Sequence, residues 1–353
     1  MGETVTLYAK WGPFLISNKE EWDFFCSYAN SSPKTNAKLM ADITESVNTM
    51  LCLNRPFMGT FDGCGHTLTV GYKDITEDYA APFRLTSGAE IKNLKVTGKI
   101  STSARFASGL IGNECDDVNK KTTTKIKNCI IDVDILSSVE GDGMHGGFVG
   151  EADFPVEIKN SAFTGSIKSA SATAKTKCCA GFVGSGSAEI ENCLLAATFD
   201  LDETGCSTFA RSVNSVTNCY YLNPLGKIEE NAKLINAEKL SGGEALSTLG
   251  AGWAMTLGSD ETPELYQESN KDTPNYIYND GTGWRCENFQ LADKADVNIG
   301  VDFTASTLSY GRTFNVGNGY CTVYVPFSIP ATNGKLYVCT GVNAEKSQAG
   351  SQK

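Results

Sequence analysis

Two short motifs alternate along the chain, and this repetition restricts the fold more than any other feature of the sequence. The first motif is Ile-x-Asn, which begins at Ile91, Ile126, Ile158 and Ile190 and has a weaker copy at Val216. The second is Gly-apolar-apolar-Gly, which begins at Gly109, Gly147 and Gly181 and has weaker copies at Ala81 and Thr208. Successive Ile-x-Asn copies are 35, 32, 32 and 26 residues apart. A period of about 20–50 residues is typical of repeat proteins built from stacked units.

Each repeat unit contains two short predicted strands, and neither could bury its apolar face alone. Stacking successive units buries those faces, which predicts a solenoid. Because strand side chains alternate, the Ile and the Asn of each motif should face the same side, toward the interior. We therefore expect a row of Ile side chains and a ladder of hydrogen-bonded Asn amides with a structural role. The ladder residues are Asn93, Asn128, Asn160, Asn192 and Asn218.

A short helix is predicted at the N-terminal end of the stack. Ser17 and Glu20 have the spacing of a capping box. The residues that follow form one apolar stripe at helical spacing. They are Trp22, Phe25, Cys26 and Ala29. We expect this helix to cover the first repeat unit.

The predicted end of the stack is followed by a second module. Ser241 and Glu244 again have capping-box spacing. The apolar residues Leu246, Leu249 and Trp253 are expected to close the far end of the solenoid. The composition changes after residue 262, and alternating strands from about residue 284 predict a smaller, β-sandwich-like module over residues 263–353. The solenoid with its end caps is predicted to span residues 13–262.

Composition excludes several classes of partner. The formal net charge of −11 argues against nucleic acid and against an anionic membrane surface. No apolar run approaches the roughly 18 residues of a membrane span. The first residues lack the basic start and apolar stretch of a signal peptide, so we expect a fragment of a longer protein. The 13 Cys include no Cys-x-x-Cys pair and are expected to be mostly buried thiols.

Catalytic and metal-binding patterns are scarce. The only two His, His66 and His145, are not accompanied by a Ser or Cys nucleophile motif, so we expect no catalytic residues, no cofactor and no enzyme. Asp132 and Asp134 alternate on one strand and are weak Ca²⁺ candidates, with Glu140 or Asp142 as neighbours. No EF-hand pattern accompanies them, and no metal site is predicted.

The loops that follow the Ile-x-Asn strands are the places where we expect a ligand, because loops vary most and project from one edge of a solenoid. Residues 137–145 and 169–178 form two such loops. The polar side chains proposed as ligand contacts are Glu140, Asp142, His145, Lys175 and Lys177.

The motifs resemble those of known surface proteins. The stretches FMGTFDGCGHTLTV, from Phe57, and GFVG followed by IENC look like the GLUG-type repeats of gut Bacteroidetes and some Firmicutes. WAMTLGSDETP, from Trp253, resembles the usual close of such a repeat block. Residues 1–12 resemble the last strand of a Listeria–Bacteroides internalin-type repeat, and residues from about 308 resemble a C-terminal β module of Bacteroidetes surface proteins. The resemblance implies a right-handed parallel β-helix on an exported, surface-attached protein.

These observations lead to three hypotheses. The first is a monomeric, non-enzymatic, adhesin-like protein of the cell surface that presents loops to a host glycan or host protein. The second is a glycan-processing or glycan-capturing component of a nutrient-uptake system. The third is a purely structural stalk. Outward rows that mix Lys, Glu and Thr without paired carboxylates argue against glycan cleavage.

Overall fold

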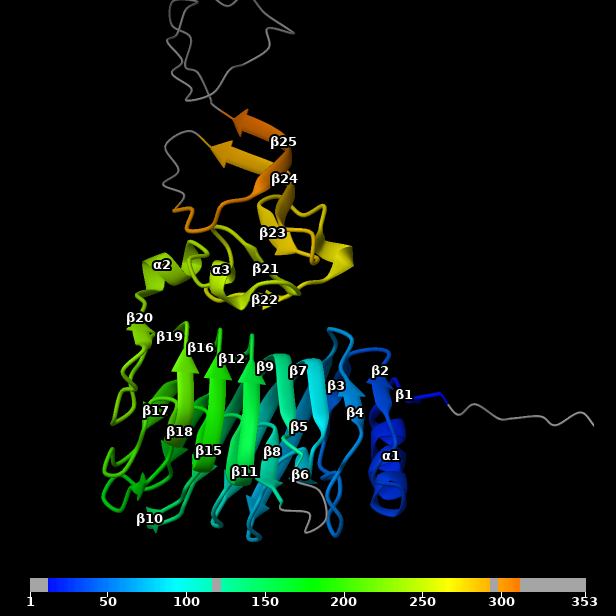
Figure 1. The fold of residues 1–353 in the computed structure, drawn as a ribbon, viewed down its shortest axis with the longest axis vertical. Helices are drawn as coiled ribbons and strands as arrows, with labels where there is room; N and C mark the ends of the chain where they lie inside the picture. The colour runs from blue at the N-terminus through cyan, green and yellow to red at the C-terminus, as the bar shows by residue number, and fades with distance from the viewer. Residues whose placement is uncertain (1–11, 116–121, 293–297, 312–353) are drawn as a thin grey trace, which may run out of the picture.

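One large parallel sheet of 18 strands dominates the fold (Figure 1). The computed structural model describes residues 12–115, 122–292 and 298–311. In this part the chain is mostly β-structure with few helices, as the sequence predicts. The strands are β1 (Phe14–Ile16), β2 (Ala37–Leu39), β3 (Ile43–Val47), β4 (Thr60–Asp62), β5 (Thr67–Ile75), β6 (Phe83–Thr86), β7 (Glu90–Thr102), β8 (Ile111–Glu114), β9 (Lys125–Ser137), β11 (Val149–Lys159), β12 (Ala162–Phe163), β13 (Ser166–Ser169), β15 (Val183–Glu191), β16 (Leu194–Leu195), β17 (Thr198–Asp200), β18 (Ala210–Thr217), β19 (Cys219–Tyr221) and β20 (Ala232–Leu234).

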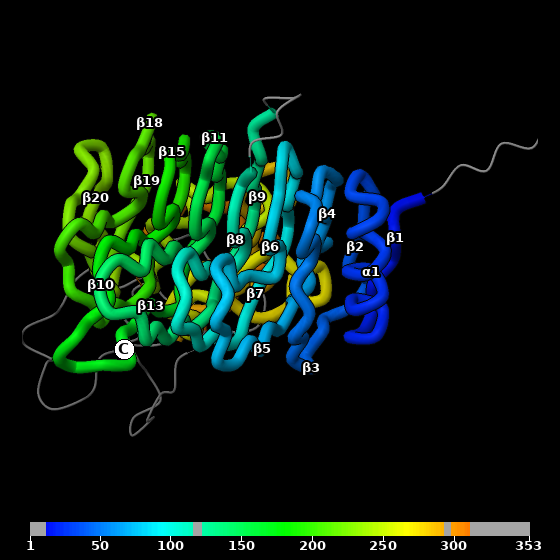
Figure 2. Tube along the Cα trace, turned by 90° about the horizontal axis from the view of Figure 1, so that it is seen from below, coloured from blue at the N-terminus to red at the C-terminus, as the bar shows by residue number. Residues whose placement is uncertain are grey.

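The repeat units lie side by side in register. Figure 2 shows them in succession, from the N-terminal helix at one end to β20 at the other. Ile126 pairs with Ile91 on one side and with Ile158 on the other, and Ile158 pairs with Ile190. All four are at most 1% exposed. The predicted interior row of Ile side chains is therefore confirmed.

The Asn residues take a different position from the predicted one. All five have φ between 48° and 55°, in the left-handed region that Asn tolerates better than most residues. This conformation interrupts the alternation of the strand, so the residue after each Asn points inward. Leu94 and Cys129 are both 0% exposed, whereas Asn93 and Asn128 are only half-buried. The prediction that Ile and Asn face the same side was wrong for this reason.

The Asn amides still form a ladder, although one step is missing. Asn128 Nδ2 donates to Asn93 Oδ1 at 3.2 Å, and Asn192 Nδ2 donates to Asn160 Oδ1 at 3.3 Å. Asn218 continues the ladder with a 2.9 Å bond to Asn192. Among the described residues no donor reaches Asn128 Oδ1, so the ladder breaks between Asn128 and Asn160.

The Gly-apolar-apolar-Gly motifs form a second set of in-register strands. Val149 pairs with Val183, and the rings of Phe148 and Phe182 stack with centroids 4.7 Å apart. Both apolar residues of each motif are buried. A Cβ on the closing Gly150 would lie 1.9 Å from the carbonyl oxygen of Phe106. This position therefore requires Gly, because the backbone of the previous unit passes too close for any side chain.

The N-terminal helix α1 (Lys19–Ser31) covers the first unit. It buries Trp22, Phe25, Cys26 and Ala29, the predicted stripe. The N-cap is Asn18, one residue after the predicted Ser17, and its side chain accepts a hydrogen bond from the Glu21 N–H at 2.9 Å. The carboxylate of Glu21 in turn accepts from the Ser17 N–H at 2.6 Å, so the capping pair is shifted by one residue along the chain.

The C-terminal elements lie along the side of the parallel sheet (Figure 1). They are α2 (Ala237–Ser241), α3 (Leu246–Leu249), the 3-10 helix η1 (Glu268–Asn270), and a five-stranded sheet of β21 (Trp253–Thr256), β22 (Glu264–Leu265), β23 (Tyr276–Asn279), β24 (Trp284–Ala292) and β25 (Thr304–Gly311). Ser241 ends α2 and caps no helix, since α3 begins after Ala245 without a side-chain cap. The second predicted capping box was wrong.

Leu246, Leu249 and Trp253 do not close the far end of the stack, contrary to the prediction. They pack in one hydrophobic cluster with Ile130, Ala162 and Leu194, which are in-register, outward-facing residues of β9, β12 and β16. We call this outward row the flank. It extends to Tyr220, which packs against the same cluster. The C-terminal elements therefore cover a side of the parallel sheet.

The second sheet does not respect the predicted module boundary. Its strand β21 precedes residue 262, whereas its other strands follow that residue. The boundary drawn from composition at 262/263 therefore passes through the sheet. The predicted strands of residues 312–342 and nearly all of the predicted tail strand of residues 1–12 lie outside the described residues.

Candidate functional site

The two loops proposed as ligand contacts lie next to each other. Their short strands β10 (Gly141–Asp142) and β14 (Thr176–Lys177) pair in parallel, with Asp142 opposite Lys177. Lys177 Nζ lies 3.8 Å from Asp142 Oδ1, and Lys175 forms an ion pair with Asp200. Glu140 is exposed in the first loop. Both predicted Lys therefore already have carboxylate partners within the protein.

His145 belongs to the interior and not to the loop surface. It is 0% exposed, and burial lowers its pKa to about 4. Its Nδ1 accepts from the Ala107 N–H at 3.0 Å, which leaves Nε2–H to donate to Ser137 Oγ at 2.8 Å. Thr176 Oγ1 donates to the same Ser137 oxygen at 3.0 Å. His145 is thus connected to the second loop through Ser137, in the protein interior, and is not available to a ligand.

Asp132 and Asp134 share the outer face of β9, as the alternation predicts, and both are exposed. Asp134 Oδ1 accepts from Ser166 Oγ at 2.7 Å. Within residues 12–115, 122–292 and 298–311, no three His, Cys, Asp or Glu side chains are arranged to hold a metal ion. Asp132 and Asp134 are therefore not joined by a third carboxylate, His or Cys of the described residues.

A groove of about 480 Å³ crosses the outer face of β5, β7, β9 and β13. We call it the lysine groove. Its polar and exposed lining consists of Lys73, Lys99, Ser101, Asp134, Leu136 and Lys168. Lys99 is in register with Asp134, which in turn is in register with Ser166. Four neighbouring strands thus present their outward side chains in successive positions, about 4.8 Å apart.

The lysine groove is locally basic on an acidic protein. Lys73, Lys99 and Lys168 are exposed, and none of them forms an ion pair with a described residue. The chain as a whole carries a formal net charge of −11. Leu136 adds an apolar surface that is 46% exposed. Three unpaired ammonium groups around one Leu provide charge and contact area for an anionic ligand.

The predicted loop of residues 169–178 borders this groove. Lys168 is the register partner of Asp200, the residue that pairs with Lys175 of that loop. The sequence analysis therefore identified the neighbourhood of the groove but not its lysines. The aligned tripeptides Lys99-Ile100-Ser101, Asp134-Ile135-Leu136 and Ser166-Ile167-Lys168 carry a signal for Lys99 and Lys168 but not for Lys73, because each central Ile is buried and its neighbours face outward.

Beside the groove lies an acidic crevice of about 680 Å³, between the parallel sheet and α2. Its carboxylates are Asp132, Glu238 and Glu261. Thr198 of the crevice is in register with Ser166 of the lysine groove, so the two hollows adjoin. The lysine groove and the acidic crevice thus form a basic and an acidic region side by side on the outer surface of the parallel sheet.

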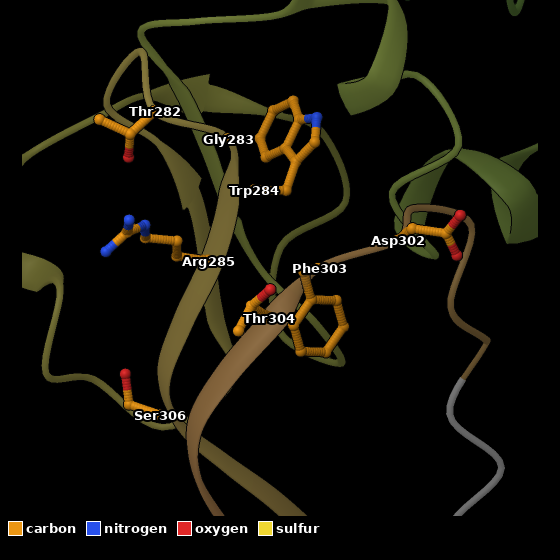
Figure 3. A pocket seen from close by; sticks show the side chains of 8 residues that line it. All are labelled: Thr282, Gly283, Trp284, Arg285, Asp302, Phe303, Thr304 and Ser306. Carbon is orange, nitrogen blue, oxygen red and sulfur yellow. The ribbon is translucent and has the colours of Figure 1, made fainter.

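A third cavity, of about 490 Å³, is lined by residues 282–285 at the start of β24 and by residues 302–304 and 306 at the start of β25 (Figure 3). Arg285 points to the side of the strands on which Thr282 and Ser306 lie, whereas Trp284 and Phe303 point to the other side. Arg285 is in register with Thr304 on β25. This cavity offers one cation, in contrast to the three of the lysine groove.

Comparisons with known proteins give little guidance. No family model and no curated protein matches the chain. One solved structure, named a "putative immunoglobulin A1 protease" from Bacteroides ovatus, is similar over 72% of this chain and 92% of that chain, with 17% identity and a TM-score of 0.49. The resemblance to GLUG-type repeats therefore stays a prediction. No helix in the described part of the chain is long and apolar enough to cross a membrane.

Proposed function

We propose that the chain is part of an exported, adhesin-like, non-enzymatic surface protein that binds an acidic glycan in the lysine groove. The observation that carries this proposal is the set of three unpaired lysines on β5, β7 and β13, within four neighbouring strands of an otherwise acidic chain. The motif resemblance supports the surface location. In this proposal the predicted loops border the binding site.

The same proposal includes a right-handed parallel β-helix as the scaffold. In-register parallel pairing between units 26–35 residues apart supports it. Left-handed Asn residues at the same place in each unit are consistent with a corner between strands. A right-handed path agrees with the strong preference of parallel crossover connections.

An acidic glycan fits the groove better than the other anionic polymers. A DNA duplex carries one negative charge per about 1.7 Å, so it would meet stronger repulsion from the rest of this acidic chain than a glycan with at most one charge per sugar. A glycan chain lying across the strands places acidic groups beside successive lysines and an apolar sugar face beside Leu136. Asp134 is the single carboxylate of the groove, and it accepts a hydrogen bond from Ser166. Glycoside hydrolysis uses two carboxylates, which supports binding without cleavage.

The test is a binding titration with hyaluronate and polygalacturonate as acidic probes and dextran as a neutral probe. We expect saturable binding of at least one acidic probe, weakened by salt, and no binding of dextran. Replacing Lys73, Lys99 and Lys168 by Ala should weaken binding by roughly 3- to 150-fold, since each exposed ion pair contributes about 0.2–1 kcal/mol.

The matched control replaces Lys34, Lys125 and Lys127, three exposed lysines outside the groove, and changes the net charge equally. An equal loss of binding affinity in the two triple variants would show that only the net charge matters, and it would overturn the proposal. Absence of binding to every probe would favour the structural stalk. Release of shorter sugars from a bound probe would favour the glycan-processing hypothesis.

A further inference from the structure

Two cysteines of neighbouring repeat units face each other near the loop edge. Cys179 and Cys206 directly precede Ala180 and Ser207, which form a parallel bridge. Neighbouring strands are about 4.8 Å apart, within the range of roughly 4.4–6.8 Å that separates the Cα atoms of a disulfide. The two side chains therefore start close to the separation that a cross-link requires.

The hydrogen bonds around Cys206 single out its sulfur. Its Sγ accepts from the Cys179 N–H at 3.2 Å. A hydrogen bond from the Cys179 thiol lowers the pKa of Cys206, and the Cys178 N–H adds to this effect. The same bond raises the pKa of Cys179. Cys206 is thus the better thiolate of the pair, and the thiolate is the reactive form of cysteine.

We propose that Cys179 and Cys206 are a modification site at which a peroxide forms a disulfide between two neighbouring repeat units. Cys206 is 4% exposed, so the oxidant must be small. Hydrogen peroxide meets this requirement, whereas a bulky disulfide or a protein partner does not. The proposal is independent of the ligand of the lysine groove.

The reaction proceeds in two steps. The Cys206 thiolate attacks one peroxide oxygen, the O–O bond breaks, and the leaving hydroxide takes up the proton that Cys206 released. Cys206 is then a sulfenic acid. The Cys179 sulfur attacks the Cys206 sulfur, the S–O bond breaks, and the leaving hydroxide takes the Cys179 proton. Two thiols are oxidised by two electrons, and one peroxide is reduced to two waters.

A second cysteine pair provides an internal comparison. Cys193 and Cys219 precede the register partners Leu194 and Tyr220, and their thiols are also in contact. Cys193 and Cys219 are both 0% exposed, whereas Cys206 is 4% exposed, so a peroxide has less access to this second pair. Burial raises the pKa of Cys193, so this pair should resist the same oxidant.

The experiment treats the full chain with hydrogen peroxide, alkylates the remaining thiols and digests without reduction, cutting after Lys, Arg and Glu. This digestion separates residues 178–189, 192–203, 204–211 and 212–227, which carry the two pairs on different peptides. We expect peptide 178–189 linked to 204–211, with the loss of two hydrogens. The apparent melting temperature should rise by about 5 °C, because the bond closes a long loop.

Cys178→Ser should retain the link, whereas Cys179→Ser and Cys206→Ser should each remove it. A link that persists in Cys179→Ser would assign the partner to Cys178 and overturn the proposal. Oxidation of Cys206 to a sulfinic acid without a link would do the same. Linkage of peptide 192–203 to peptide 212–227 at an equal rate would also overturn the proposal, because peroxide would then not single out Cys179 and Cys206. The wild-type mapping stands even if a variant does not fold.

Discussion

The indole N–H of Trp253 donates to the backbone carbonyl of Asn160 at 3.2 Å, across 93 residues of sequence. This bond lies at the interrupted step of the Asn ladder. Gly252, at φ 88°, packs beside Asn128, where a Cβ would lie 3.1 Å from Nδ2. The C-terminal elements are therefore joined to the parallel sheet by a hydrogen bond and a close backbone approach, in addition to the apolar flank.

Replacing Trp253 by Phe should destabilise the protein by about 1–3 kcal/mol, because the part-buried Asn160 carbonyl loses its donor and the smaller ring underfills a fully buried site. Denaturant unfolding, followed by circular dichroism, measures the change. Trp284→Phe is the control, since Trp284 is only half-buried. Equal destabilisation by both substitutions would contradict a special contribution of the Trp253 contact.

Replacing Asn192 by Ala should cost about 2 kcal/mol in the free energy of unfolding. An L-residue with a Cβ pays roughly 1–2 kcal/mol at positive φ, and the bonds to Asn160 and Asn218 are lost. Asn192→Gly should cost about half as much, since Gly accepts the backbone but not the ladder. Asn214→Ala, at an exposed position without positive φ, should be neutral. An equal loss for Ala and Gly would rule out the backbone contribution.

His145 predicts a pH dependence of stability. Its folded pKa of about 4 lies below the ordinary value of 6.5, so the unfolded chain binds a proton between these pH values that the folded chain does not. Stability should therefore fall as pH decreases from 6.5 to about 4, by roughly 3 kcal/mol in total.

His145→Gln should flatten this slope relative to the wild type, measured by denaturant unfolding at several pH values. Burial raises the pKa of Glu114 and of Glu229, and both act in the opposite direction. Glu114 and Glu229 are present in both the wild type and His145→Gln, so their contributions cancel when the two slopes are subtracted. Parallel slopes for wild type and variant would contradict the prediction.

Glu229 terminates the second strand set at its last unit. Its carboxylate is 5% exposed and accepts from the N–H groups of Phe209 and Ala210 at 3.1 and 3.2 Å. Glu229→Ala should leave two buried donors unpaired and cost about 3 kcal/mol. Its exposed neighbour provides the control variant, Glu230→Ala, which should have almost no effect in the same unfolding experiment. Similar losses for the two variants would show that the carboxylate does not close the strand set.

The sequence predicts the interior rows because buried Ile, Phe and Val recur at fixed positions of every unit. It does not predict the inward residue after each Asn, since a left-handed backbone cancels the alternation on which the argument depends. The sequence also carries a signal for the covered flank. The pairs Ile130-Ile131, Ala162-Phe163 and Leu194-Leu195 are apolar on both faces, which indicates a strand buried on both sides.

The lysine groove could not be found from single motifs. Lys73 lies on β5 and Lys168 on β13, and β7 and β9 separate these two strands. The pairing of β5 with β7 also shifts register between Tyr72 and Ile75, so the position of Lys73 does not follow from the strand pattern. Only the pairing of four strands brings these side chains to one face. The prediction that Leu246, Leu249 and Trp253 close the far end of the stack was wrong for a similar reason. An apolar segment can cover either the end or the side of a stack, and the sequence does not distinguish the two.

Gln267 Nε2 donates to the Gly65 carbonyl oxygen at 2.6 Å, while Trp253 reaches Asn160 and Tyr220 packs against the same cluster. The C-terminal elements thus contact early, middle and late units together. Stacked repeats that touch only their neighbours can fray from the ends, one unit after another. Here a single unit cannot open without first breaking its contacts with the C-terminal elements, which the other units share. The described chain should therefore unfold in one cooperative transition.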